Sequence, residues 1–166
     1  MTALPPRKMR QSKTYGEKDL DFYTIESTPG VTSGAVFRDS EALGAFLTSV
    51  CRSKIWKVKW KKTKLHVYLR PRWVTTARGG RTKNFPFIEI PDSPFGKSVH
   101  TIIHELAHAL SGDGTHGPRF LKSMLRLMRE FEGIHFAETL EKKWKGYNSN
   151  LLREKNGKLE TPRNRR

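Results

Sequence analysis

The stretch from Ser98 to Leu110 constrains the fold more than any other part of the chain, because its residues divide into two helical faces. Its apolar side chains recur at spacings of three and four residues, as in a helix that packs on a core: Val99, Ile102, Ile103, Leu106 and Leu110. His104 and His108 lie four residues apart, so the same helix presents both imidazoles on one side. The stretch therefore predicts a helix with one buried face and one reactive face.

The reactive face carries the motif His-Glu-x-x-His, which is suited to a metal ion. Zinc accepts neutral imidazole nitrogens, and a catalytic zinc ion takes three protein ligands and keeps one position open for water. Glu105 directly follows the first histidine, where its carboxylate can take a proton from a water whose pKa the metal has lowered. We therefore expect one zinc ion on His104 and His108, with Glu105 as the catalytic base.

The third ligand is expected from the segment after this helix. Gly112 and Gly114 allow the chain to turn back toward the metal, and His116 comes just before a second apolar-striped helix over 118–131. Pro118 suits the first position of that helix, so His116 would be held by a packed element, and we favour it as the ligand. Three carboxylates remain as alternatives, although a turn or a solvated helix end would also explain them: Asp113, Glu130 and Glu132.

The two histidine motifs, His-Glu-Leu-Ala-His and His-Gly-Pro-Arg-Phe, and the Met- and Leu-rich helix after them resemble those of the SprT-like zinc metallopeptidases. The chain is still more similar to a small family of bacterial and phage predicted metallohydrolases, over roughly residues 35–135. The resemblance implies a zincin-like fold and peptide-bond hydrolysis. It also implies that the two motifs supply three zinc ligands and the catalytic base: His104, His108, His116 and Glu105.

The other patterns predict a single α+β domain. A chain of 166 residues has room for one such domain. The expected fold is zincin-like, with a small twisted antiparallel or mixed sheet packed on the metal-binding helix and on a second, supporting helix. The domain is expected over 21–147, between a flexible basic arm at 1–20 and a basic, disordered tail at 148–166.

Two further helices and the cellular compartment can also be predicted. Asp39 suits the cap of a helix that ends near Cys51, and a short helix is expected over 135–144.

Cys51 is the only cysteine, which excludes an intrachain disulfide and fits a reducing compartment. No apolar run has the length of a signal peptide or a membrane span, so we expect a cytoplasmic protein without a membrane partner.

The distribution of charge points to nucleic acid. The chain carries 32 Lys plus Arg against 16 Asp plus Glu, and the stretch from Ala42 to Ile88 contains twelve basic residues and no acidic one. Two alternating runs in this stretch, 56–60 and 65–69, predict a hairpin with one apolar and one basic face. Such one-sided charge favours phosphate contacts with little sequence preference. The predicted nucleic-acid contacts are Lys57, Lys59, Lys61, Lys62, Lys64, Arg70, Arg72, Arg78, Arg81 and Lys83.

Three segments near the motifs invite further expectations. Residues 85–91 predict a strand bracketed by prolines, which indicates an edge of the sheet. This edge could hold an extended peptide, or its prolines could serve only to prevent aggregation through strand pairing. The basic segment 78–84 is expected to be a flexible loop that could act as a lid. His100 could orient the neighbouring ligand, although a capping or exposed role fits it better. Candidates for stabilising an oxyanion are His135, Arg119 and Tyr147.

These features favour a zinc-dependent peptidase that acts on proteins bound to nucleic acid. The expected partners are a protein substrate and nucleic acid, and the sequence does not assign an oligomeric state. Two alternatives remain: a zinc-dependent nucleic-acid hydrolase that processes RNA, and a nucleic-acid-binding or structural protein that zinc only stabilises. Glu105 favours the peptidase, because zincin-like RNA-processing enzymes usually lack this glutamate. An open fourth position on the metal argues against a purely structural zinc.

Overall fold

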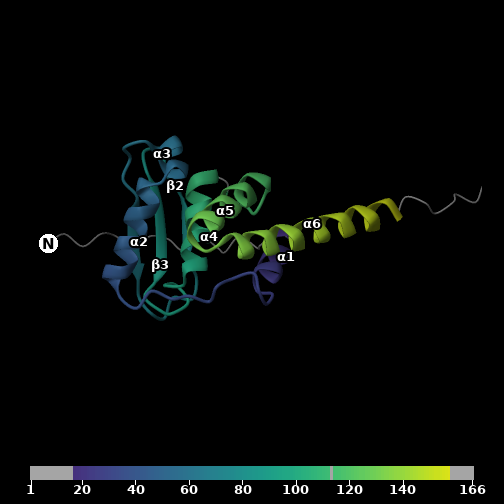
Figure 1. Ribbon diagram of the computed structural model, residues 1–166, viewed down its shortest axis with the longest axis horizontal. Helices are drawn as coiled ribbons and strands as arrows, with labels where there is room; N and C mark the ends of the chain where they lie inside the picture. The colour runs from purple at the N-terminus through teal and green to yellow at the C-terminus, as the bar shows by residue number, and fades with distance from the viewer. Residues whose placement is uncertain (1–16, 113, 158–166) are drawn as a thin grey trace, which may run out of the picture.

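The computed structural model describes residues 17–112 and 114–157, with side chains between 22 and 146. In this part of the chain, six helices accompany a three-stranded mixed sheet (Figure 1), which confirms the predicted α+β class. In chain order the elements are α1 (Glu17–Glu26), α2 (Ser40–Arg52), α3 (Lys54–Trp60), β1 (His66–Arg70), β2 (Arg78–Arg81), β3 (Pro86–Pro91), α4 (Val99–Ser111), α5 (Pro118–Phe131) and α6 (Ile134–Gly157).

The sheet is built around β3, which lies between β1 and β2. β1 runs parallel to β3 with Val67 opposite Ile88, and β2 runs antiparallel to β3 with Gly79 opposite the same residue. The predicted edge position of the proline-bracketed strand is therefore wrong. Pro86 and Pro91 occupy the first and last positions of β3, where a missing N–H removes no hydrogen bond from the middle of the ladder.

The predicted hairpin is also wrong, because its first strand is the helix α3. Ser53 caps this helix, and its hydroxyl accepts the N–H of Trp56 at 3.3 Å. Trp56 and Trp60 lie four residues apart, a spacing that suits one face of a helix as well as one face of a strand. Trp56 is 1% exposed, whereas Val58 between the two is 75% exposed. β1 pairs with β3 instead, and its predicted core face is open, with Leu69 50% exposed.

The helices around the metal motifs begin and end at local signals in the sequence. Asp39 caps α2 by accepting the N–H of Ala42 at 2.8 Å, and Ser98 caps α4 by accepting the N–H of Thr101 at 3.1 Å. α4 ends at Gly112, whose φ of 66° is a left-handed conformation that glycine adopts without strain. Helix α5 starts with a proline, as predicted.

Helices α1 and α6 extend beyond the sequence predictions. α1 begins at Glu17, inside the stretch assigned to the N-terminal arm, and α6 runs on to Gly157, into the stretch assigned to the tail. Figure 1 shows α6 projecting from the rest of the molecule, with α1 packed beside it. Residues 1–16 and 158–166 lie outside the described residues. In the described part of the chain, no helix combines the length and the apolar character needed to cross a bilayer.

Helix α4 is the most enclosed element of the described fold. It packs on β2 and β3 on one side and on α5 on another. Every residue from Thr101 to Leu110 is buried, including the polar side chains of the histidine motif. Ile88 and Ile90 of the central strand are fully buried as well. The helix that carries the motif is therefore fixed against both the sheet and its neighbouring helix.

Candidate metal centre

The structure brings together the three histidines that the sequence singled out. His104 and His108 lie on successive turns of α4, and His116 lies in the turn before α5. Nε2 of His104 is 3.2 Å from Nε2 of His108 and 3.0 Å from Nε2 of His116. For all three pairs the ring centroids are between 4.9 and 5.0 Å apart and the ring planes differ by between 60° and 63°. The imidazoles thus form a nearly symmetric triangle.

This triangle could hold one metal ion. A tetrahedral ion with nitrogen ligands at about 2.0–2.1 Å separates two ligand nitrogens by about 3.3 Å, which is close to the separations observed. Without a cation or a shared proton between them, neutral imidazoles in this arrangement would direct nitrogen lone pairs at one another. The donor set suits zinc and also other divalent ions that accept imidazole.

Aromatic side chains surround the three imidazoles and fix their orientation. Phe22 of α1 stacks on His116, with ring centroids 4.8 Å apart and planes within 5°. Phe120 of α5 contacts all three imidazoles at centroid distances between 4.3 and 4.9 Å. The histidines are between 5% and 8% exposed. An apolar shell of this kind keeps the rings in one geometry and limits the access of water.

Glu26, at the end of α1, contacts His104, the first of the candidate ligands, and the sequence analysis did not identify it. Its Oε1 lies 2.9 Å from Nδ1 of His104 and 3.0 Å from Nε2 of His100. A carboxylate on Nδ1 fixes the imidazole tautomer that leaves the Nε2 lone pair free for a metal. Burial alone would raise the pKa of Glu26, but the two histidines outweigh burial and lower this pKa to about 2. Glu26 and His104 are 78 positions apart, so no local pattern links them.

His100 and Glu132 continue the hydrogen-bonded chain behind the candidate metal centre. Nδ1 of His100 lies 3.1 Å from Oε2 of Glu132, whose other oxygen accepts the N–H of Ser33 at 2.9 Å. The exposed role expected for His100 and the solvated role expected for Glu132 are wrong, because these side chains are 14% and 0% exposed. Of the other two carboxylates considered as ligands, Glu130 is exposed and Asp113 lies outside the described residues.

These contacts of His100 should make the stability of the metal-free protein depend on pH. Burial alone would lower the pKa of His100, but hydrogen bonds to Glu132 and Glu26 raise it from 6.5 to about 9. A raised pKa means that the folded chain favours the protonated imidazole, so the stabilisation is complete below pH 6.5 and is lost as the pH rises through 9. In urea unfolding with a chelator, we expect a loss on the order of 3 kcal/mol over this range. The pKa values of His104 and Glu105 are also raised, so both chains should lose some stability as the pH rises. His100→Gln should lack only the part of the loss that comes from His100, and equal slopes in the two chains would contradict the expectation.

Glu105 lies at the junction of α4 and β2. Its carboxylate accepts the backbone N–H of Gly79, so the strand orients the candidate base. The two main chains pack so closely that a Cβ at Gly79 would overlap the carbonyl oxygen of Glu105. Burial raises the pKa of Glu105 to about 7, despite the opposing effect of His104. In the chain without a metal ion, this carboxyl group would therefore take up and release a proton near neutral pH.

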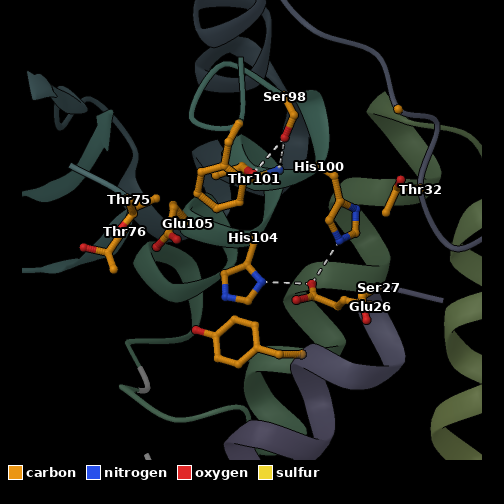
Figure 2. A pocket seen from close by; sticks show the side chains of 14 residues that line it. Glu26, Ser27, Thr32, Thr75, Thr76, Ser98, His100, Thr101, His104 and Glu105 are labelled. Atoms are coloured by element: carbon orange, nitrogen blue, oxygen red, sulfur yellow. Dashed lines mark hydrogen bonds and ion pairs between the residues drawn. The ribbon is translucent and has the colours of Figure 1, made fainter. Parts of the chain in front are cut away.

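A pocket of about 500 Å³ opens beside Glu105 and His104. Figure 2 shows Glu105 and Thr76 on one side of His104 and His100 on the other. The lining combines hydroxyl groups, aromatic rings and the carboxylates of Glu26 and Glu105. Among the residues that the structure describes, no lysine or arginine lines this pocket. The candidate ligand and base therefore share a space without lysine or arginine in its described lining, although the positive charge of Arg78, outside the lining, acts on Glu105.

The predicted nucleic-acid contacts lie outside the pocket lining. Nine of them are exposed, on α3, on the turn after it and on the segments around β2: Lys57, Lys59, Lys61, Lys62, Lys64, Arg72, Arg78, Arg81 and Lys83. Arg70 is half-buried, and one of its guanidinium nitrogens lies 3.8 Å from Glu89. The lid expected over 78–84 is wrong for its first half, because Arg78–Arg81 form β2 and pair with β3.

The structure gives no support to the oxyanion candidates that it describes. His135 and Arg119 are exposed on α6 and α5 and do not line the pocket, and the side chain of Tyr147 is not among those described. Tyr23 of α1 does line the pocket and stacks on His104, with centroids 5.6 Å apart and planes within 14°. The sequence did not indicate this tyrosine because it did not predict α1.

Comparison of the chain with protein-family models, curated proteins and solved structures found no match. The fold and the site by themselves define a small α+β protein with a three-histidine cluster that could bind a metal ion. Glu105, directly beside the first of these histidines, faces the same pocket, and a functional interpretation has to begin from that pair.

Proposed function

We propose that the protein is a zinc-dependent peptidase of the SprT-like type. The observation that carries the proposal is that His104 and Glu105 line one pocket, so a metal ligand and a candidate base face the same substrate space. The donor set supports it, because three imidazoles leave a tetrahedral zinc ion one position for water or substrate. The resemblance of the two histidine motifs to those of SprT-like enzymes points the same way.

In this reaction Glu105 moves the proton. A bound zinc ion supplies polarisation of the scissile carbonyl and lowers the pKa of a water molecule. The Glu105 carboxylate takes a proton from the attacking water and delivers it to the amide nitrogen as the carbon–nitrogen bond breaks. The N–H of Gly79 orients that carboxylate, and Glu26 holds His104 in the tautomer that ligation requires.

The chemistry of the pocket favours a peptide over a phosphodiester as the substrate. Enzymes that cleave or transfer phosphoryl groups place cationic side chains or additional metal ions on the phosphate oxygens. The described lining of this pocket instead contains Glu26 and Glu105 and no lysine or arginine. β2 is an edge strand that lies against Glu105, so an extended peptide could pair with it by strand addition. We therefore assign to β2 the role that the sequence assigned to β3.

We further propose that the substrates are proteins held on nucleic acid. The formal charge of the chain is +16, far more than solubility requires. Exposed lysines of α3 and of the turn after it, such as Lys57 and Lys61, offer phosphate contacts outside the pocket lining. Nucleic acid can therefore be bound without occupying the space in which Glu105 acts.

The test is cleavage of a DNA-binding protein, with and without single-stranded DNA, by the zinc-loaded chain. Glu105→Gln should slow cleavage by about 10²–10⁴-fold, because it removes the general base and keeps the shape of the side chain. Zinc content should not change. Glu130→Gln, at an exposed glutamate of α5, is the matched control and should cleave at the native rate. Equal rates for Glu105→Gln and the native chain would contradict the proposal, and cleavage of RNA alone would favour the nucleic-acid hydrolase.

A further inference from the structure

The pocket extends to one side of the candidate metal centre instead of surrounding it. The part of α4 that lines it runs from the cap residue Ser98 to Glu105 and includes only the first of the three ligands. His108 and His116 do not belong to the lining. The hollow therefore runs from the reacting centre along the N-terminal half of α4, where a substrate residue next to the scissile bond would lie.

Aromatic and small side chains from other segments complete this hollow. Phe95, between β3 and α4, is 56% exposed, and Tyr23 of α1 is 40% exposed, yet both line the pocket. Ala77 and Thr76 line it from the segment before β2. Large apolar surfaces left open inside a concave site are typical of places where a ligand buries apolar groups.

The charged groups of the lining disfavour an acidic occupant. Glu26 and Glu105 both contribute carboxylates. His100 is the only basic side chain of the described lining other than the ligand His104, and it is already shared between Glu26 and Glu132. An aspartate or glutamate of a substrate would meet two carboxylates here, and the described lining has no lysine or arginine to offset them.

The size of the pocket suits a bulky side chain. A cavity of roughly 150 Å³ accommodates a benzene ring. A pocket of about 500 Å³ therefore has room for a large side chain together with the backbone that carries it. An alanine or glycine side chain would leave most of this space unfilled.

We propose that this pocket is a specificity subsite for a large apolar side chain, such as phenylalanine, leucine, methionine or tyrosine, in an extended peptide. The side chain lies next to the bond presented to Glu105, and aspartate and glutamate are excluded at this position. The inference rests on the proposed peptidase function and names the class of substrate for it. Phe95 and Thr76 are the residues that shape the preference.

Peptide binding to a chain that does not cleave tests the subsite separately from catalysis. Zinc-loaded Glu105→Gln is titrated, by fluorescence anisotropy, with three labelled hexapeptides that differ only in one central residue: Phe, Ala or Glu. We expect the Phe peptide to bind at least about 10-fold more tightly than the Ala peptide, because apolar groups that fill a pocket contribute differences of this size. The Glu peptide should bind most weakly. Equal affinities for the three peptides would overturn the proposal.

Two substitutions at exposed positions of the lining test whether the preference for the Phe peptide arises in this pocket. Each is introduced into the Glu105→Gln chain. Thr76→Trp should fill the pocket and remove the preference for the Phe peptide over the Ala peptide. Phe95→Ala should reduce the preference by about three- to tenfold. Trp73→Ala removes an aromatic side chain that is 82% exposed and lies outside the lining, so it should keep the full preference. An unchanged preference in both lining variants would overturn the assignment of the side chain to this pocket.

Cleavage of the same three peptides by the native zinc-loaded chain separates the two proposals. Faster cleavage of the Phe peptide than of the Ala and Glu peptides supports both the peptidase proposal and the subsite proposal. If the binding preference holds and no peptide is cleaved, the peptidase proposal fails and the subsite stands as a peptide-binding site. If all three peptides are cleaved at equal rates, the subsite fails and the peptidase proposal stands.

Discussion

Replacing His116 with alanine should abolish stable binding of one divalent metal ion. The variant leaves only His104 and His108 of the three converging imidazoles. Removing a supporting partner of a ligand lowers metal affinity by about 10–100-fold, and removing a ligand itself should cost more than that. Equilibrium dialysis against zinc measures the affinity directly. Zinc at 100 times its Kd should also stabilise the native chain by about 2.7 kcal/mol, and this gain should vanish in the variant.

Two comparisons separate the loss of a ligand from the loss of packing. His116 stacks on Phe22, so the alanine variant also leaves a gap in the packing. Unfolding in the presence of a chelator measures the loss of stability that this gap causes, without any contribution from zinc. His135→Ala removes an exposed imidazole from α6 and should bind zinc with native affinity. If His116→Ala bound zinc as tightly as the native chain, the third ligand would have to come from another residue, and Asp113 would be the next to replace.

The parts of the site that lie on α4 and α5 could be predicted because their signals are local. Each signal lies within one or two helical turns of the feature that it predicts. These signals are the spacing of the apolar residues, the pair of histidines, and the helix end and helix start at Gly112 and Pro118. The close approach of His116 to the other two histidines follows from the same short turn. Local patterns of this kind survive in the fold because each agrees with the packing around it.

The features that the sequence did not reveal depend on contacts between distant segments. The central position of β3 depends on its pairing with β1 and β2, and no residue of β3 itself encodes which strands those are. The spacing of Trp56 and Trp60 fits the period of a helix and also that of a strand. The helix therefore depends on the cap at Ser53 and on tertiary packing. Glu26 reaches the candidate metal centre from α1, whose sequence shows little helical amphipathicity. His100 also contacts this unpredicted helix through Glu26, and its other ring nitrogen contacts Glu132.

Gly79→Ala should destabilise the protein by about 3 kcal/mol or more, although the change adds only one methyl group. A Cβ at this position would overlap the carbonyl oxygen, the carbonyl carbon and the Cα of Glu105. Both partners are main chain, one in a strand paired with β3 and the other inside a buried helix, so neither can turn aside as a side chain would. The strand must move away from α4, and this movement also withdraws the N–H that orients the Glu105 carboxylate.

Urea unfolding of matched glycine variants measures this effect. Gly80→Ala, at the next position of β2, would place its Cβ 3.3 Å from the flexible ring of Phe87, so we expect a loss below about 1 kcal/mol. Gly44→Ala lies in α2 with nothing within 4 Å of the added Cβ, and it should stabilise the chain by up to about 1 kcal/mol, because alanine favours a helix. A similar midpoint for Gly79→Ala and Gly80→Ala would mean that β2 and α4 are farther apart than the structure places them. Because the same contact positions the candidate base, a Gly79→Ala chain that remains folded should bind zinc normally and still hydrolyse its substrate more slowly than the native chain.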